Sequence, residues 1–195
     1  MDISSKEIKV LHDTDFLLTK SAVLEKIYTL LEDTRTELLK CVKDSSFSYP
    51  EGIDIKTGKI SRGENYKNLP YMVLDYPTLF TNESSFAYRT MFWWGNFFSS
   101  TLHLEGKELE KYRTTYRDNI DKLLDQDIFI GVGDTPWQYH YREENYLPLT
   151  KDHSNFISNC NFLKLSKKIS INDWKKLPSF ASNFFDLMLS ILSRS

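Results

Sequence analysis

The sequence predicts a single α+β domain, and the order of its hydrophobic patterns carries that prediction. A segment with helical spacing comes first, a long region with β-type alternation follows, and helical spacing returns at the C-terminus. Strict alternation of helices and strands would instead favour a parallel sheet. We therefore expect residues 1–195 to form one domain, with a mainly antiparallel sheet of about five or six strands covered by N-terminal, middle and C-terminal helices.

An N-terminal helix is expected over residues 16–42, where an apolar residue recurs every three or four positions. Asp13 or Asp15 could cap its start, because a short acidic side chain accepts hydrogen bonds from the free N–H groups of a first turn. The next segment changes period, and residues 71–76 form a short apolar run between two prolines. Because proline cannot donate to a sheet, we expect a strand that ends at Pro77.

Residues 89–104 admit two arrangements, which differ in what happens at Gly95 and Asn96. A hairpin would turn at this pair, whereas one long strand would place an almost wholly apolar set of alternating side chains on one face. We favour the single strand, because such a face is suited to a core. Residues 105–124 then return to helical spacing and predict a helix that covers the sheet.

Shorter elements are expected in the last third of the chain. Residues 127–132 predict a strand, residues 137–141 a strand that returns beside it, and residues 142–158 a long loop. Residues 161–171 alternate lysine with apolar side chains, as is typical of an edge strand. A closing helix follows, because Pro178 suits a first helical turn and an apolar stripe comes after it.

The charge balance argues against nucleic-acid and membrane-surface partners. The 25 Lys and Arg residues nearly balance 27 Asp and Glu residues, so the chain lacks the broad positive field that such partners require. The N-terminus shows no secretory signal and no apolar run is long enough to span a membrane, which predicts a cytoplasmic protein. Cys41 and Cys160 lack the spacing of a zinc site and are expected to be free thiols, so we predict no metal site.

Aromatic residues concentrate in residues 86–98, where seven of thirteen are Phe, Tyr or Trp. Most of these rings should pack in the core, but a guanidinium among them could stack on a ring and hold a carboxylate or phosphate. The first hypothesis is therefore a small-ligand-binding protein whose pocket holds an anionic ligand at Arg89. The residues expected to line that pocket are Trp93, Tyr66, Tyr76 and Asn65.

Arg89 also has a structural interpretation, in which it pairs with Asp75 or Glu64. If it holds a ligand instead, replacing it with alanine should abolish binding at little cost in stability. The second hypothesis is an enzyme, in which His103 acts with Asp75 or Glu64 as an acid–base pair in the same cleft.

The third hypothesis is an interaction module, in which the aromatic face is an exposed patch for a protein partner. No phosphate-binding loop, zinc-protease motif or serine-hydrolase elbow is present in the sequence, so neither a cofactor nor a reaction is indicated. The choice between an enzyme and a binding protein stays open, and no residue indicates a particular oligomeric state.

Overall fold

The computed structural model describes residues 2–192 of the chain. Five α-helices lie in this part: α1 (Ser5–His12), α2 (Thr14–Asp44), α3 (Lys107–Asp118), α4 (His153–Asn159) and α5 (Leu177–Leu192). The strands are β1 (Lys59–Tyr66), β2 (Leu69–Phe80), β3 (Ser84–Trp93), β4 (Phe97–Gly106), β5 (Phe129–Gly131), β6 (Tyr146–Pro148) and β7 (Phe162–Ser170). They form one antiparallel sheet in the order β1-β2-β3-β4-β7-β5-β6. The α+β class is confirmed, with more strands than expected.

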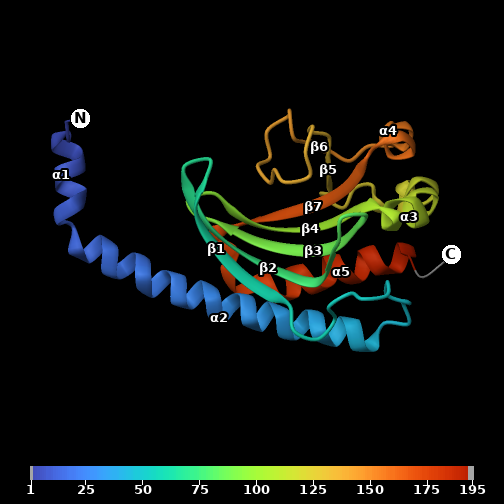
Figure 1. Cartoon of the computed structure of the whole chain (residues 1–195), viewed down its shortest axis with the longest axis horizontal. Helices are drawn as coiled ribbons and strands as arrows, with labels where there is room; N and C mark the ends of the chain where they lie inside the picture. The colour runs from blue at the N-terminus through green and yellow to red at the C-terminus, as the bar shows by residue number, and fades with distance from the viewer. Residues whose placement is uncertain (1, 193–195) are drawn as a thin grey trace.

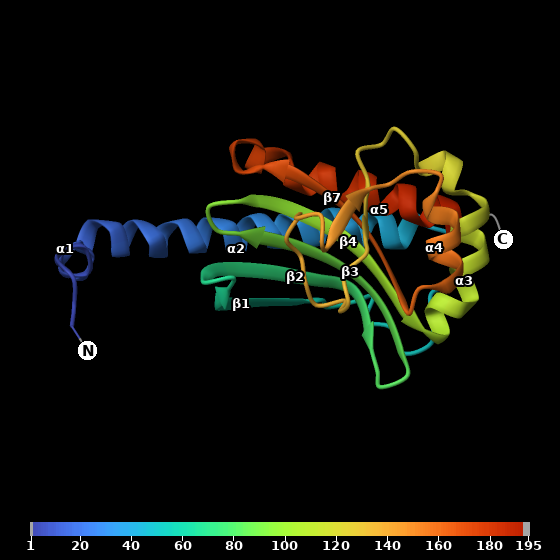
Figure 2. The same ribbon diagram turned by 90° about the horizontal axis from the view of Figure 1, so that it is seen from above.

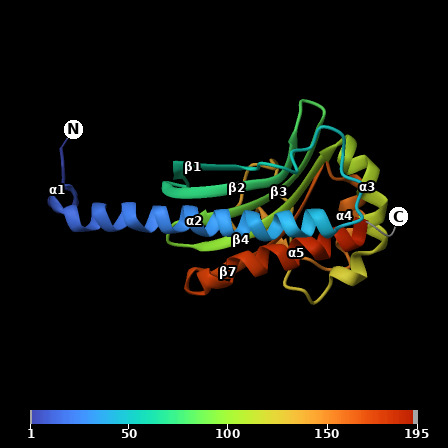
Figure 3. The same ribbon diagram turned by 90° about the horizontal axis from the view of Figure 1, so that it is seen from below.

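Helices α2 and α5 lie side by side on one face of the sheet (Figures 1 and 3). The strands present alternate apolar side chains to this face, and these join the two helices in the main hydrophobic core; they include Met72, Leu74, Phe86, Tyr88, Leu102 and Leu165. The opposite face is covered by residues 132–145, which we call the covering loop (Figures 1 and 2). Each face of the sheet therefore has its own cover.

The two long helices form where the sequence predicts them. Asp13 caps α2, since its carboxylate accepts a hydrogen bond of 2.8 Å from the Phe16 N–H group. Only the later part of α2 packs on the sheet, and the first of its buried residues is Ile27. Pro178 lies in the first turn of α5, and the hydroxyl of Tyr88 donates to the carbonyl of Ala181 at 2.7 Å, which ties β3 to that helix.

The expected single strand over residues 89–104 is wrong, because the chain turns between β3 and β4. Gly95 has a φ of +73°, a left-handed conformation that glycine adopts without strain, and the strands pair from Trp93 and Phe97 outward. Phe92 is paired with Phe98. Since both positions are even, a long strand and a hairpin place the same side chains on the apolar face, and alternation alone could not separate the two.

The expected end of the strand at Pro77 is also wrong, since β2 runs on to Phe80. The β2–β3 register shifts between Asp75 and Thr78, so Pro77 lies in an irregularity where no ladder hydrogen bond is needed from it.

The end of the sheet near α4 also differs from the expected arrangement. Residues 137–141 belong to the covering loop, and the strand that returns beside β5 is β6. Residues 142–158 contain β6 and most of α4 rather than only a loop. Strand β7 lies inside the sheet, between β4 and β5, although β5 pairs with it only at Leu165 and Ser166. The expected helix over residues 105–124 is shorter, because α3 gives way to a 3₁₀ turn at Ile120–Leu123.

Candidate functional site

The sheet face under the covering loop is lined by polar and charged side chains, and we call it the polar face. Strand alternation places them there, because residues two apart on one strand share a face and paired residues on neighbouring strands lie side by side. They come from β2, β3, β4 and β7: Asp75, Arg89, Thr101, His103, Lys164 and Ser166. All are buried except Arg89, which is half-buried.

Arg89 is bound within the chain through all three guanidinium nitrogens. Its Nε and one terminal nitrogen donate to the Asp75 carboxylate at 2.6 and 2.7 Å, and the other terminal nitrogen donates to the Tyr139 hydroxyl at 3.0 Å. The guanidinium carbon also lies 5.0 Å from the centre of the Tyr139 ring. Of the two expected partners, the structure therefore selects Asp75. These contacts use three of the five N–H groups of the guanidinium.

Two further residues of the expected pocket join Arg89 on the polar face. The indole N–H of Trp93 donates to the Tyr66 carbonyl at 3.3 Å, and the two rings pack edge to face with centres 5.2 Å apart. The Tyr66 hydroxyl accepts hydrogen bonds from the backbone N–H groups of Tyr139 and His140, at 2.6 and 3.1 Å. These contacts hold the covering loop against the sheet.

Three predicted site residues lie elsewhere. Tyr76 is on the opposite face, in the main core, where its hydroxyl donates to the carbonyl of Ile55 at 2.8 Å. Asn65 is exposed at the end of β1. Glu64 forms an ion pair of 2.8 Å with Lys20 of α2. The structure thus brings together Arg89, Asp75, Trp93 and Tyr66, and leaves out Tyr76, Asn65 and Glu64.

His103 is buried on the polar face, with only 1% of its surface exposed. Neither ring nitrogen has a hydrogen-bond partner, although Nε2 lies 3.4 Å from the Glu105 carboxylate. Burial, together with the charges of Lys164 and Arg89, lowers the pKa of His103 to about 3, so the ring is neutral at pH 7. The carboxylate nearest to its nitrogens is Glu105, which the sequence analysis did not single out, and neither Asp75 nor Glu64 makes a hydrogen bond to it.

Lys164 is a candidate functional residue that could not be recognised from the sequence. It is fully buried, its ammonium donates to the Gln138 carbonyl, and it lies over the rings of Tyr139 and Tyr146 at 4.4 and 4.7 Å. Burial and the charge of Arg89 lower the pKa of Lys164 to about 7. In the sequence, this residue is one of several lysines in an alternating strand, a pattern typical of a solvent-facing edge, so no local signal marks it.

The described residues contain no cluster of side chains suited to a metal ion. Among residues 2–192, no group of three or more His, Cys, Asp or Glu side chains is placed to hold a metal ion. Cys41 and Cys160 are both free thiols. Burial, and after it a hydrogen bond with Asp186, raises the pKa of Cys41 to about 12, which leaves it unreactive at pH 7.

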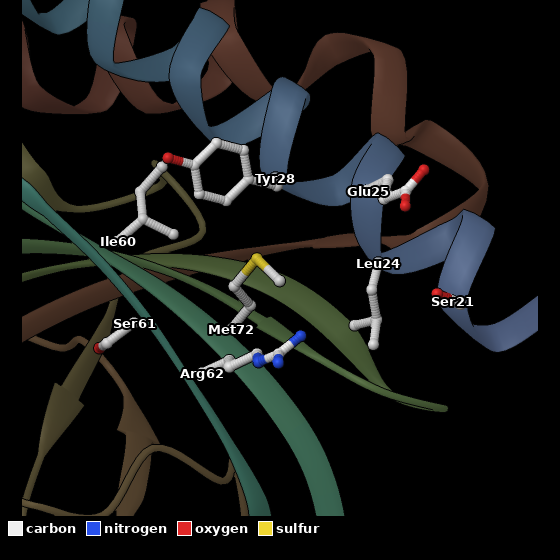
Figure 4. Close-up of a pocket in the computed structure, with 8 residues that line it drawn as sticks. All are labelled: Ser21, Leu24, Glu25, Tyr28, Ile60, Ser61, Arg62 and Met72. Atoms are coloured by element: carbon white, nitrogen blue, oxygen red, sulfur yellow. The ribbon is translucent and has the colours of Figure 1, made fainter.

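A groove opens at the base of α2, on the edge of the sheet away from the polar face (Figure 4). Its volume is about 410 Å³. Helix α2 supplies Leu24, Glu25 and Tyr28, and the sheet supplies Ile60 and Arg62 of β1 and Met72 of β2. The floor is apolar and the rim carries one positive and one negative side chain.

The chain segment just before this groove projects from the body of the protein (Figure 1). It consists of α1 and the first turns of α2, and every residue from Asp2 to Thr19 is exposed. We call residues 2–19 the arm. Seven of the twelve large hydrophobic residues that are exposed in the described part of the chain lie in it, with exposed fractions from 42% to 69%: Ile3, Ile8, Val10, Leu11, Phe16, Leu17 and Leu18.

Within residues 2–192, no helix is both long enough and apolar enough to cross a membrane. Comparisons with protein-family models, with curated proteins and with solved structures found no match to this chain.

Proposed function

We propose that the protein is an interaction module that assembles with a second copy of itself through the arm. The observation that carries this proposal is that seven large apolar side chains are all exposed on a helical segment that leaves the body of the protein. Exposed apolar patches of this kind are typical of surfaces that bind another protein.

The helical conformation of the arm supports the same proposal. Isolated helices shorter than about 12–15 residues are marginal in water, and most helix stability in proteins comes from packing of an apolar face. Helix α1 has eight residues and none of them is buried. Its capping box, in which Ser4 and Glu7 bond each other's backbone N–H groups, contributes only about 1 kcal/mol. A partner surface would supply the missing packing.

The second copy is favoured as partner because the chain carries both halves of a contact. The arm is a projecting helical segment with exposed apolar side chains, and the groove on α2 is a hollow whose lining begins at Ser21, two residues after the arm ends. Two copies related by a two-fold axis could each place an arm in the other's groove. The arm also has four carboxylates and two lysines, a net charge of −2. Asp13 and Asp15, at the junction of α1 and α2, are opposite in charge to the exposed Arg62 at the rim of the groove, which also carries Glu25.

The negative charge of the arm also makes a membrane surface or a nucleic acid a less suitable partner for it. Helices that lie on membrane surfaces usually have a polar face rich in Lys and Arg, and nucleic-acid contacts need clustered positive charge. The arm has neither.

The three hypotheses from the sequence differ in the support that the geometry gives them. The interaction hypothesis is retained, but with a different surface. The aromatic block of residues 86–98 is largely buried, so we place the interaction surface on the arm instead. The small-ligand and enzyme hypotheses stay predictions with weaker support, since Arg89 is already paired with Asp75 and His103 has no hydrogen-bonded acid–base partner. The cytoplasmic location is likewise a prediction.

Sedimentation velocity over a wide range of protein concentration tests the proposal. The wild type should form a dimer that dissociates on dilution, and a Leu11→Glu, Leu18→Glu variant should stay monomeric, because carboxylates cannot enter an apolar contact without a partner. Phe80→Glu is the matched control. Phe80 is also a large exposed apolar residue, but it is the last residue of β2, beside the β2–β3 turn and away from the arm, so this variant should dimerise normally. A wild type that is monomeric at every concentration contradicts the proposal.

Charge reversal tests whether the arm enters the groove. Asp15→Lys and Arg62→Glu should each weaken the dimer, and the double variant should recover part of the loss, since the opposite charges meet again with their positions exchanged. Equal weakening in the singles and further weakening in the double would argue for contact between the two arms instead.

A further inference from the structure

A second hollow, of about 440 Å³, lies at the end of the sheet where the β2–β3 turn meets the covering loop. Its lining includes Phe80 and Trp137, the carboxylate of Glu105, and the amides of Asn82 and Asn161. The buried ring of His103 lies behind it and contacts both aromatic residues. This site is separate from the arm and its groove, which lie at the opposite end of the molecule (Figure 2).

The two aromatic residues of this pocket are unusually open to solvent. Phe80 is 42% exposed and Trp137 is 52% exposed, and their ring centres are 5.7 Å apart. Each also packs against His103, with ring centres 6.3 and 5.8 Å away. The result is a small aromatic surface fixed from behind by a buried side chain. The face of such a ring carries negative charge density and attracts cations.

The charged side chains that line the pocket are carboxylates. Among the described residues that line it, none is Lys or Arg, and Glu83, one of its two carboxylates, is already bound to Lys107. The other carboxylate, Glu105, has a side chain that is 40% exposed, so it is available to a ligand. The side-chain oxygens of Asn82 and Asn161 are exposed acceptors at the rim.

His103 provides the second, independent indication of a ligand. Both of its ring nitrogens are buried without a hydrogen-bond partner, a situation that costs free energy and is uncommon in native proteins. Its Nε2 faces Glu105, at 3.4 Å from the carboxylate oxygen. Because the ring is neutral at pH 7, one nitrogen is an acceptor. A donor bound at the Glu105 carboxylate would therefore lie next to the ring of His103 as well.

Two positive side chains, Lys164 and Arg89, lie under the pocket and disfavour a cation beside His103, as their effect on the pKa of that ring shows. The ion pair with Asp75 offsets part of the charge of Arg89. Lys164 has a pKa of about 7, so it carries only part of a charge at neutral pH.

From these contacts we propose that the pocket of Phe80, Trp137 and Glu105 binds a small organic cation with a primary ammonium group. The ammonium group would lie against the two rings and donate hydrogen bonds to the Glu105 carboxylate and the His103 ring.

NMR titration with n-butylammonium tests this proposal, with n-butanol at the same concentration as the neutral control and sodium chloride to match ionic strength. The cation should produce saturable shifts at the Trp137 indole N–H and the His103 ring signals, and n-butanol should not. Glu105→Gln, which keeps the size and the exposure of the side chain, should weaken binding by about tenfold or more, equivalent to about 1.4 kcal/mol. Trp137→Ala should weaken it as well, whereas Trp174→Ala, at another exposed tryptophan, should bind like the wild type.

Three results would overturn the proposal: no saturable shift in the wild type, equal shifts with n-butanol, or unchanged binding in Glu105→Gln. Equal shifts with the alcohol would mean a merely apolar pocket. The Leu11→Glu, Leu18→Glu variant should bind n-butylammonium normally, because its substitutions are in the arm. Failure of the cation site and failure of the arm dimer are therefore separate outcomes.

Discussion

Lys164 is a lysine held in the interior by one carbonyl and two aromatic rings, and its charge is the least compensated on the polar face. Its pKa is lowered from 10.5 to about 7, so between these values the unfolded chain holds a proton that the folded chain has released. Protonation therefore favours unfolding in this window. Stability from this residue rises with pH, by up to about 1.4 kcal/mol per pH unit.

Lys164→Met should remove that dependence, because methionine fills a similar volume and does not titrate. The measurement is urea unfolding of both proteins at several pH values from neutral to about 10. The difference in unfolding free energy between wild type and variant should shift in favour of the wild type as pH rises. Taking the difference cancels the buried tyrosines, which titrate in both proteins. A difference that does not change with pH would mean that Lys164 keeps an ordinary pKa.

The ion pair of Arg89 and Asp75 changes what is expected of Arg89→Ala. The ligand hypothesis predicts little loss of stability, but the variant leaves a buried carboxylate without its cation. Removing one partner of a buried pair costs about 3–5 kcal/mol, whereas replacing both with apolar residues is often neutral. Thermal or urea unfolding should therefore show a large loss for Arg89→Ala and a much smaller one for the double variant Arg89→Met, Asp75→Leu. Equal losses in the two proteins would argue against the pair.

For single residues, the sequence could predict which charged side chains pair with each other, but not which of them become buried. The neighbourhood of Arg89 and Asp75 was foreseeable from complementary charge on adjacent short strands. The separation of Asp75 from Tyr76 was also foreseeable, since neighbours on one strand point to opposite faces. The burial of Lys164 and His103 was not, because it depends on the covering loop, which contacts the sheet through residues far away in sequence.

The β3–β4 hairpin and its exit into α3 depend on two glycines with different surroundings. Gly95 in the turn and Gly106 at the end of β4 both have positive φ, of 73° and 61°. A Cβ at residue 95 would meet no neighbour, whereas one at residue 106 would collide with the carbonyl oxygen of Glu83. The same substitution should therefore have different effects at the two positions.

Gly95→Ala should cost about 1–2 kcal/mol for the left-handed conformation alone. Gly106→Ala should cost clearly more, because the backbone at Glu83 must also move. Urea unfolding of the two variants measures both losses, with Gly95→Ala as the matched control. Losses of the same size would show that the β2–β3 turn does not press on residue 106.

Among the elements, the two long helices α2 and α5 were predictable, whereas α1, α4 and the strand connections were not. The period of α2, its Asp13 cap and the position of Pro178 are local signals, and each is found where expected. The turn after β3 could not be predicted, because a hairpin at Gly95 and one long strand place the same apolar side chains on the same face of the sheet. The interior place of β7 was hidden because the pairing of β5 with it is a long-range contact.

At the scale of the whole molecule, the body buries its apolar side chains within itself, whereas the arm does not. The body has an apolar core between the sheet and the two long helices, and a polar face closed by the covering loop. The arm is exposed throughout and presents apolar side chains to solvent. Only part of the arm was predicted to be helical, because the predicted helix begins at residue 16 and omits α1. The sequence pattern also does not show what the arm packs against.

Hydrogen–deuterium exchange of the arm, measured at protein concentrations above and below self-association, is the most direct test of the proposed function. If the arm docks on a second copy, the backbone amides of α1 and the first turns of α2 should be protected at high concentration and exchange rapidly on dilution. The amides of β3 and β4 should be equally protected at both concentrations, which provides an internal control. Rapid exchange of the arm at every concentration would contradict the proposal.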